Sequence, residues 1–200
     1  MKYVFIIGFV LMAAMQWYPP LSMIRDANKT LDGGVEFKFR TAPVDPSDPF
    51  RGKFVRLSFA AEAYHPVDTN QMHFDSQSQV WAVLEEDSAG YARVAYLSGE
   101  RPTSESNYIP AEFIYGMKYD SQVNVVLKFP FDRFYVEESK ASDAEQVYWQ
   151  SRVDQFENPD SLVVCYARVM VMNGDAKLVD VIINDSSIVD VVKRMNANRE

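Results

Sequence analysis

The sequence predicts a mainly β, α+β fold, in which an N-terminal membrane-anchor helix precedes one antiparallel β-sandwich or barrel-like domain with one main helix near residues 142–155. Three observations lead to this prediction. The chain begins with a long uncharged apolar run, its middle contains short segments in which apolar and polar residues alternate, and turn residues separate these segments. With 200 residues, 48% of them apolar, the chain is long enough for one domain with a substantial core.

The N-terminal run extends from Tyr3 to Ile24 without a charged residue. A helix of roughly 20 apolar residues spans the hydrocarbon core of a bilayer, so this run is long enough to cross once. Trp17 and Tyr18 are placed like interfacial anchors, and Pro19-Pro20 is expected to kink or end the helix. A second short helix over residues 21–31 is expected to stop at Gly33-Gly34.

Two other interpretations of the run stay open, a cleaved signal peptide and a buried core helix. A signal peptide needs small residues at positions −3 and −1 of its cleavage site. Cleavage after Ala13 or Ala14 places Leu11 or Met12 at −3, which does not fit. We therefore expect residues 1–24 to be a single-span anchor and residues 25–200 to form the attached domain.

The flanking charges bear on topology. Lys2 precedes the run and favours a cytoplasmic N-terminus, whereas Arg25 and Lys29 follow the run and weaken this signal. With the N-terminus inside, the protein is single-pass in the cytoplasmic membrane and its domain faces the periplasm or the cell exterior. The single cysteine, Cys165, suits an oxidising compartment, where a second free thiol could cross-link wrongly.

Composition excludes several classes of function. The chain has 20 Lys and Arg against 28 Asp and Glu, a net charge of −8, which argues against a nucleic-acid partner. One cysteine excludes an intrachain disulfide and multi-cysteine zinc or iron–sulfur sites, and no cofactor is expected.

The body of the chain predicts strands joined by recognisable turns. Asn173-Gly174 is typical of a tight hairpin, Ser142 with Glu145 fits a helix capping box, and residues 186–194 fit either a strand or a short helix. The polar stretch 62–78 reads as a long loop. The expected strands are 35–40, 53–60, 80–84, 91–97, 108–115, 124–129, 163–171 and 176–183, with Val35, Phe37, Phe39, Val55, Leu57, Phe59, Val125, Leu127 and Phe129 among the inward residues.

A proline-rich loop leads into the second of these strands. Three prolines stiffen residues 42–52, Gly52 allows the turn into the strand, and Arg51 can pair with Asp45 or Asp48. One interpretation is a rigid connector that sets strand register. The other is a loop that displays polar side chains to a partner. The residues concerned are Asp45, Asp48, Arg51, Gly52, Phe54, Leu57 and Phe59.

The eight residues 52–59, GKFVRLSF, resemble the signature Gly-Asp-Tyr-x-x-Leu-x-Tyr of the GDYXXLXY family. Gly52 and Leu57 match outright, Phe54 and Phe59 replace tyrosines, and Lys53 replaces the aspartate. Residues 134–138, FYVEE, resemble the family's aromatic-rich strand that ends in a glutamate. The resemblance implies a bacterial, membrane-anchored or exported protein, often encoded beside polytopic membrane proteins, and implies no reaction.

Catalytic motifs are sparse. Dinucleotide, P-loop, zinc-protease and nucleophile-elbow signatures are absent. His65, His73 and Asp75 share one polar loop and could bind a metal or hold a general base, although a solvated loop is the simpler explanation. A signal-peptidase-like arrangement would need a serine and a buried lysine, and Ser22 and Lys128 do not form such a pair.

We therefore expect an interaction or accessory module for a membrane partner, such as a polytopic membrane protein, and not an enzyme. Recognition would use a strand edge or the proline-rich loop. Two alternatives remain: a small-ligand binding domain with an aromatic pocket, and a metal-dependent or hydrolytic enzyme that uses the loop from His65 to Asp75.

Overall fold

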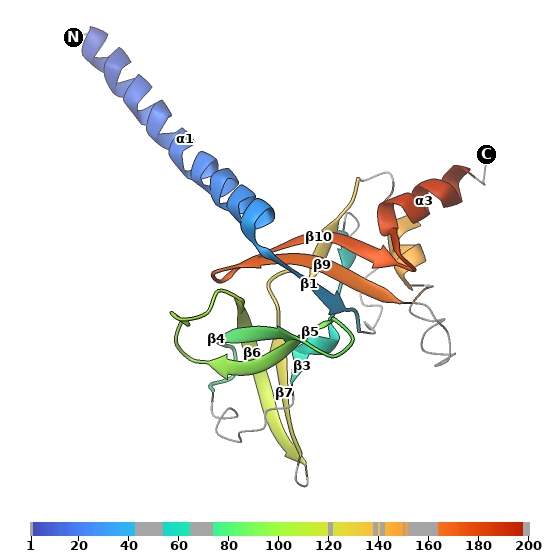
Figure 1. Ribbon diagram of the computed structural model, residues 1–200. Helices are drawn as coiled ribbons and strands as arrows, with labels where there is room; N and C mark the ends of the chain where they lie inside the picture. Colours follow the sequence, from blue (N-terminus) through green and yellow to red (C-terminus); the bar gives the residue numbers. More distant parts are fainter. Residues whose placement is uncertain are drawn as a thin grey trace.

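The structure is a long helix attached to a body of antiparallel sheets (Figure 1). The computed structural model describes residues 2–42, 54–64, 74–119, 122–137, 140, 143–149, 151 and 164–197. A four-stranded sheet has the order β1-β9-β10-β11 and crosses over a five-stranded sheet of order β3-β7-β6-β4-β5, while β2 and β8 form a two-stranded ribbon. This two-layer arrangement confirms the predicted β-rich α+β class.

The strands follow the predicted alternation closely. The strands of the four-stranded sheet are β1 (Val35–Arg40), β9 (Cys165–Met172), β10 (Asp175–Ile183) and β11 (Ser186–Ser187). Those of the five-stranded sheet are β3 (Ala63–Tyr64), β4 (Ser78–Glu86), β5 (Ala92–Ser98), β6 (Tyr108–Tyr119) and β7 (Gln122–Lys128). The ribbon consists of β2 (Phe54–Arg56) and β8 (Arg133–Tyr135).

Helix α1 (Lys2–Gly33) is continuous, so the alternative that Pro19-Pro20 ends one helix before a second begins is wrong. Each proline removes one intrahelical N–H donor. The helix tolerates this loss because it continues for several turns on both sides, and the hydroxyl of Ser22 donates to the Pro19 carbonyl at 2.8 Å. The helix also extends past residue 24 into the body.

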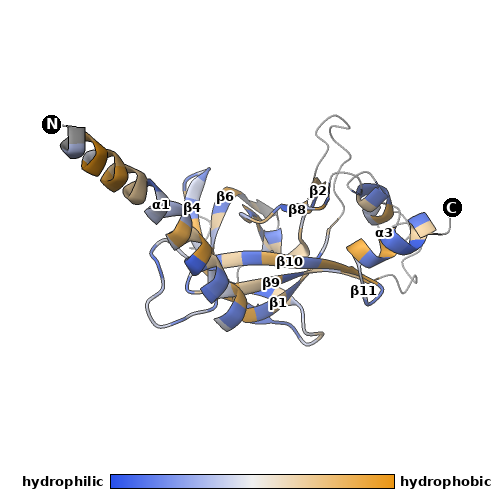
Figure 2. Ribbon diagram, turned by 90° about the horizontal axis from the view of Figure 1, so that it is seen from above, coloured by the Kyte–Doolittle hydropathy of each residue, from blue (hydrophilic) through white to orange (hydrophobic). Residues whose placement is uncertain are grey.

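The N-terminal two-thirds of α1 projects from the body as a rod. Its large apolar side chains between Tyr3 and Ile24 are each more than half exposed where they are described. Figure 2 shows hydrophobic colour along the outer part of the rod and a change to hydrophilic colour where it reaches the body. No part of the described body covers this surface, which excludes the alternative of a buried core helix.

The core lies between the two large sheets. Four phenylalanines meet at its centre, with Phe39 edge-on to Phe59, Phe129 and Phe131 at centroid distances of 5.6, 5.6 and 5.2 Å. Such edge-to-face pairs add about 0.5–1.5 kcal/mol each beyond their buried area. Val35 departs from the prediction, since it is 45% exposed at the first position of β1 and lies outside this core.

The second predicted strand is shorter than expected. Residues 54–56 pair with β8, but the Leu57 amide then donates to the Asp132 carbonyl at 2.8 Å and Phe59 forms an isolated bridge with Thr41. The chain changes partner at this point and turns into the 3-10 helix η1 (Ala60–Glu62). Val55, Leu57 and Phe59 are nevertheless all buried, as the alternation predicts.

The C-terminal half confirms the turn signals. Asn173 and Gly174 have φ angles of 50° and 85° and connect β9 to β10 in a tight hairpin. Residues 143–149 and 151 are helical, whereas Ser142, Gln150 and residues 152–163 lie outside the described residues. Helix α3 (Ile188–Ala197) resolves the ambiguity of residues 186–194 and lies beside helix 143–149, with Asn196 donating to Asp143 at 3.0 Å.

The junction of α1 with the body depends on close backbone approach. The Gly34 amide donates to the Thr30 carbonyl at 3.0 Å, and a Cβ at position 34 would lie 2.4 Å from that carbonyl and 3.0 Å from the Val171 carbonyl. Buried Thr30 also donates to the Asp175 carboxylate at 2.8 Å. These contacts fix the end of α1 to the β9–β10 hairpin.

Gly34→Ala is therefore expected to lower the free energy of unfolding by about 2 kcal/mol or more, because both clashing atoms belong to the backbone. Gly33→Ala is the matched control, since its Cβ would meet only the Met172 sulfur at 3.9 Å and should change stability by less than about 1 kcal/mol. Urea unfolding of the full chain in detergent micelles measures both. Equal stability of the two variants would contradict the close approach.

Candidate functional site

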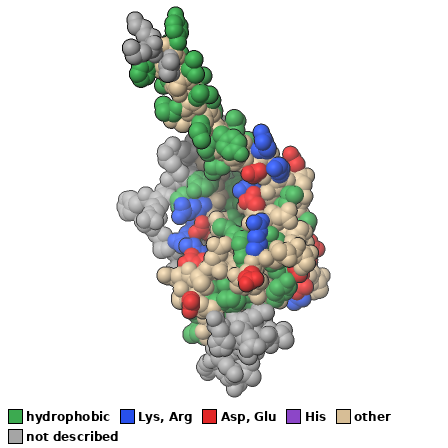
Figure 3. Space-filling view, turned by 90° about the vertical axis from the view of Figure 1, so that its left-hand side faces the viewer, with side chains coloured by type: hydrophobic (Ala, Val, Ile, Leu, Met, Phe, Trp, Pro, Cys, Tyr) green, Lys and Arg blue, Asp and Glu red, His purple; other side chains and the backbone are tan. Residues whose placement is uncertain are grey.

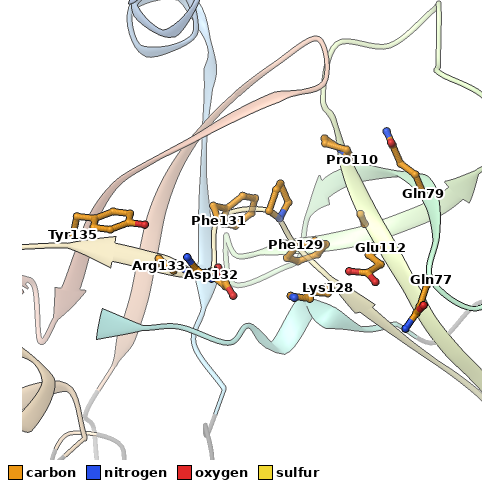
Figure 4. A pocket seen from close by; sticks show the side chains of 12 residues that line it. Gln77, Gln79, Pro110, Glu112, Lys128, Phe129, Phe131, Asp132, Arg133 and Tyr135 are labelled. Atoms are coloured by element: carbon orange, nitrogen blue, oxygen red, sulfur yellow. Dashed lines mark ion pairs between the residues drawn. The ribbon is translucent and has the colours of Figure 1, made fainter. Parts of the chain in front are cut away.

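A groove of about 570 Å³ opens beside the strand ribbon that contains the signature segment. Its floor is the connection from β7 to β8, and Figure 4 shows side chains from β4, β6, β7 and β8 around it. This connection passes through the phenylalanine cluster of the core, so the groove is built on a rigid base. The side chains that give the groove its chemistry are Gln77, Gln79, Glu112, Lys128, Asp132, Arg133 and Tyr135.

The lining of the groove is polar and electrically balanced. Two carboxylates, Glu112 and Asp132, face two cations, Lys128 and Arg133, and the Arg133 Nε lies 3.6 Å from the Asp132 carboxylate. The amides of Gln77 and Gln79 provide both donors and acceptors at the opposite end (Figure 4). This set favours a ligand that is itself a mixed donor and acceptor, such as a polypeptide main chain.

The β2–β8 ribbon borders the groove and contains residues 54–56 of the signature segment. Phe54 pairs with Tyr135 in register, with ring centroids 5.9 Å apart, and the Arg133 guanidinium lies 5.1 Å from the centre of the Phe54 ring. Tyr135 is 68% exposed. Within the described part of the chain, neither strand of the ribbon pairs with a third strand.

Glu62 connects the signature segment to the floor of the groove. Its carboxylate accepts the backbone N–H of Phe59 at 2.9 Å and that of Phe129 at 3.1 Å. Burial raises the pKa of this carboxyl above its usual 4.5, because the two N–H groups only partly offset the cost of desolvation. The side chain thus fixes η1 against the end of β7 and holds two otherwise unpaired amides.

The predicted site residues divide into three groups. Leu57 and Phe59 belong to the core at 2% and 1% exposure, and Phe54 lies half-buried on the outer face of the ribbon. The polar residues of the proline-rich loop, Asp45, Asp48, Arg51 and Gly52, lie outside the described residues. The proposal that the loop displays them to a partner therefore stays a prediction.

The predicted metal or base cluster is only partly in view. Asp75 is exposed in the turn before β4, and its carbonyl accepts the Ser78 amide at 3.0 Å, whereas His65 and His73 lie outside the described residues. Among the residues that the structure describes, no three His, Cys, Asp or Glu side chains gather as a metal site would require. The structure therefore adds nothing to the metal interpretation.

Comparison with known proteins supplies the family. The family model described as GDYXXLXY protein matches residues 16–181. The chain belongs to the GDYXXLXY family. No curated protein and no solved structure gives a significant match.

The GDYXXLXY signature of this chain therefore has a structural role that can be stated residue by residue. Leu57 and the aromatic residue at position 59 enter the core, while the aromatic residue at position 54 packs on Tyr135 and Arg133 of β8. Residues 134 and 135, which the resemblance singles out, form the partner strand of the signature. Sequence reasoning missed Glu62, Asp132 and Arg133. Phe129, Phe131 and Phe134 are buried while Arg133 is exposed, which breaks the simple alternation on which the strand predictions relied.

Glu62 predicts a specific pH dependence. Because its folded-state pKa is raised, the protonated carboxyl favours the folded state. This contribution is fully present below about pH 4.5 and is lost as the pH rises through the folded-state pKa. Glu62→Gln is expected to remove this part of the pH dependence. At pH 7 it should cost about 1–3 kcal/mol, because one backbone N–H then faces an amide donor.

Urea unfolding of the full chain in micelles between pH 4 and 8 measures this effect as the difference between the parent protein and the variant. Glu86→Gln, at an exposed position of β4, serves as the matched control. A difference that stays constant with pH would show that Glu62 ionises as an ordinary exposed carboxyl.

Proposed function

We propose that this GDYXXLXY protein is a single-pass membrane protein whose body is an interaction module for a membrane-embedded partner, held outside the cytoplasmic membrane with the N-terminus inside. The observation that carries the proposal is the uncovered apolar rod of α1, which is fixed at its far end to the sheets. Residues Phe5–Gly33 form a helix long and apolar enough to cross a membrane, which weakly suggests an anchor on length and composition alone.

Several features support an anchor over a freely moving leader. The helix continues without a break from the apolar segment into the body, and its last turns are bonded to β9 and β10. About 30 Å of helix from Phe5 to Ile24 matches the hydrocarbon thickness. A leader destined for removal gains nothing from a fixed junction, whereas an anchor gains a defined orientation of the body.

The groove beside the signature ribbon supports the interaction module. The groove suits an extended polypeptide that adds main-chain hydrogen bonds at a strand edge. It offers balanced charges and amide side chains, and it lies beside a two-stranded ribbon. A continuous membrane tether confines partner and module to two dimensions and so raises the effective concentration of one for the other. We therefore assign the groove to an extended segment of a membrane protein.

The anchor is tested by placing charge in the middle of the rod. Leu11→Asp combined with Met15→Asp should move most of the protein from the membrane fraction to the soluble fraction or block its export, since each charge costs about 2.5–3.5 kcal/mol at the centre of a span. Lys29→Asp, beyond the apolar run, is the control and should leave the protein in the membrane. Extraction with alkaline carbonate separates the outcomes. Release of the parent protein by carbonate would overturn the anchor.

Topology can be read with the same chain, because Cys165 is 1% exposed and should label slowly. A cysteine introduced at exposed position Glu100 should react with a membrane-impermeant maleimide in intact cells. Labelling only after the cytoplasmic membrane is broken would reverse the proposed orientation.

The groove is tested by photocrosslinking at matched tyrosines. A photoreactive phenylalanine analogue at Tyr135, on the border of the groove, should crosslink to a protein that resists carbonate extraction. The same analogue at Tyr115, an exposed tyrosine of β6 that does not line the groove, should not. Arg133→Glu should abolish the crosslink at Tyr135. Equal crosslinking at both tyrosines, or none at Tyr135, would contradict this use of the groove.

A further inference from the structure

A second groove lies at the base of α1, where the apolar rod meets the body. It has a volume of about 690 Å³ and is formed by one face of the helix on one side and by Met172, at the end of β9, on the other. The helical face comprises Leu21, Ile24, Arg25, Asn28, Lys29, Asp32 and Gly33. The spacing of these residues by three and four positions keeps them on one side of a straight helix.

The lining of the groove changes from apolar to charged along the helix. Leu21 and Ile24 lie near the end of the uncharged run, and Arg25 and Lys29 follow within the next two turns. Figure 3 shows Lys and Arg gathered with acidic side chains where the hydrophobic rod enters the body. Since a span from Phe5 to Ile24 places Ile24 at the edge of the hydrocarbon, Arg25 and Lys29 lie at the depth of the lipid phosphates.

The two cations are available to a ligand to different degrees. Within the described residues, Arg25 forms no ion pair, and it is exposed. Lys29 lies 3.2 Å from Asp26, with both side chains more than 60% exposed. An exposed pair of this kind contributes little, so Lys29 can leave Asp26 for a phosphate at small cost. Asp32 also lines the groove. It lies about 10 Å further along the helix than Arg25 but only about 4.5 Å beyond Lys29, so Arg25 is the less neutralised of the two cations.

Charge complementarity determines which lipid the groove prefers. A chain with a net charge of −8 is repelled by a negatively charged membrane surface. A cationic pair at headgroup depth offsets this repulsion locally, and the adjacent apolar wall can take an acyl chain in the same groove. Met172 closes the far side, so the site differs from an ordinary cationic flank on a bare helix.

We propose that this groove binds one anionic phospholipid, with the phosphate between Arg25 and Lys29, an acyl chain along Leu21 and Ile24, and Met172 next to the headgroup at the body end of the groove. The proposal rests on the proposed membrane anchoring. A lipid held here wedges between α1 and the β9–β10 hairpin, at the junction where Thr30 and Gly34 fix the helix to the body. The bound lipid would therefore hold the body at a defined tilt above the membrane.

The test uses native mass spectrometry of the full chain, extracted in detergent and titrated with either phosphatidylglycerol or phosphatidylcholine. Since each cation at the surface contributes roughly a fivefold preference, the parent protein should bind one phosphatidylglycerol about 10- to 30-fold more tightly than phosphatidylcholine. The preference should fall as NaCl is raised from 50 to 500 mM. Arg25→Gln combined with Lys29→Gln should reduce the preference to twofold or less.

Matched variants separate this site from general surface charge. Arg93→Gln with Lys193→Gln removes two exposed cations of β5 and α3 and should leave the preference unchanged. Arg25→Lys with Lys29→Arg should retain it. Met172→Glu places a negative charge on the far wall and should weaken binding of the anionic lipid while leaving phosphatidylcholine unaffected. Near-ultraviolet circular dichroism checks that each variant is folded.

The outcomes distinguish this inference from the anchor itself. A parent protein that does not insert into lipid nanodiscs would overturn the anchor and, with it, the lipid site. A parent protein that inserts but binds both lipids equally would overturn the lipid site alone. Retained preference in Arg25→Gln/Lys29→Gln, or its loss in Arg93→Gln/Lys193→Gln, would place the selectivity elsewhere and also overturn the proposal.

Discussion

The close contact between the end of α1 and the β9–β10 hairpin is the constraint on which the rest of the molecule depends. The Thr30 and Val171 carbonyls leave no room for a side chain at Gly34, and the Thr30 hydroxyl donates to Asp175, the first residue of β10. The Thr30 and Lys177 hydrogen bonds outweigh the opposing effect of burial and lower the pKa of Asp175, which keeps this acceptor ionised. Without these contacts α1 could change its orientation relative to the sheets. With them, the helix and the four-stranded sheet are held in one fixed orientation.

The hairpin that receives the helix is in turn held by the other sheet. The Arg101 guanidinium donates to the Asn173 carbonyl at 2.7 Å and to the Tyr108 hydroxyl at 2.8 Å, and Gly174 approaches the rings of Tyr108 and Trp81 too closely for any side chain. A change in the orientation of α1 therefore acts on both layers of the body through one turn. The turn residues do more than reverse the chain, because they connect α1 to the sheet that bears the groove.

Local patterns were sufficient to predict most strands, since alternation reports directly which side chains enter the core. Val125, Leu127 and Phe129 show this, and so does the turn at Asn173-Gly174, where only residues that tolerate positive φ fit. The same local reasoning wrongly allowed the helix to end at Pro19-Pro20, because a rule about lost hydrogen bonds does not account for the stability of a long helix on both sides. Glu62 could not have been identified as a bridging carboxylate, because its two partner amides become neighbours only after β7 and η1 pack together.

The lining of one groove could be predicted from the sequence better than that of the other, because one is formed by a single helix and the other by several strands. The groove at the base of α1 derives most of its lining from consecutive turns of one helix, so its gradient from Leu21 to Lys29 is visible in the order of residues. The groove beside the signature ribbon collects side chains from β4, β6, β7 and β8, and its balanced charge exists only once those strands are assembled. A signature defined by residues such as Leu57 and Phe59 therefore describes the core that supports the groove beside the ribbon, and not the polar side chains that line it.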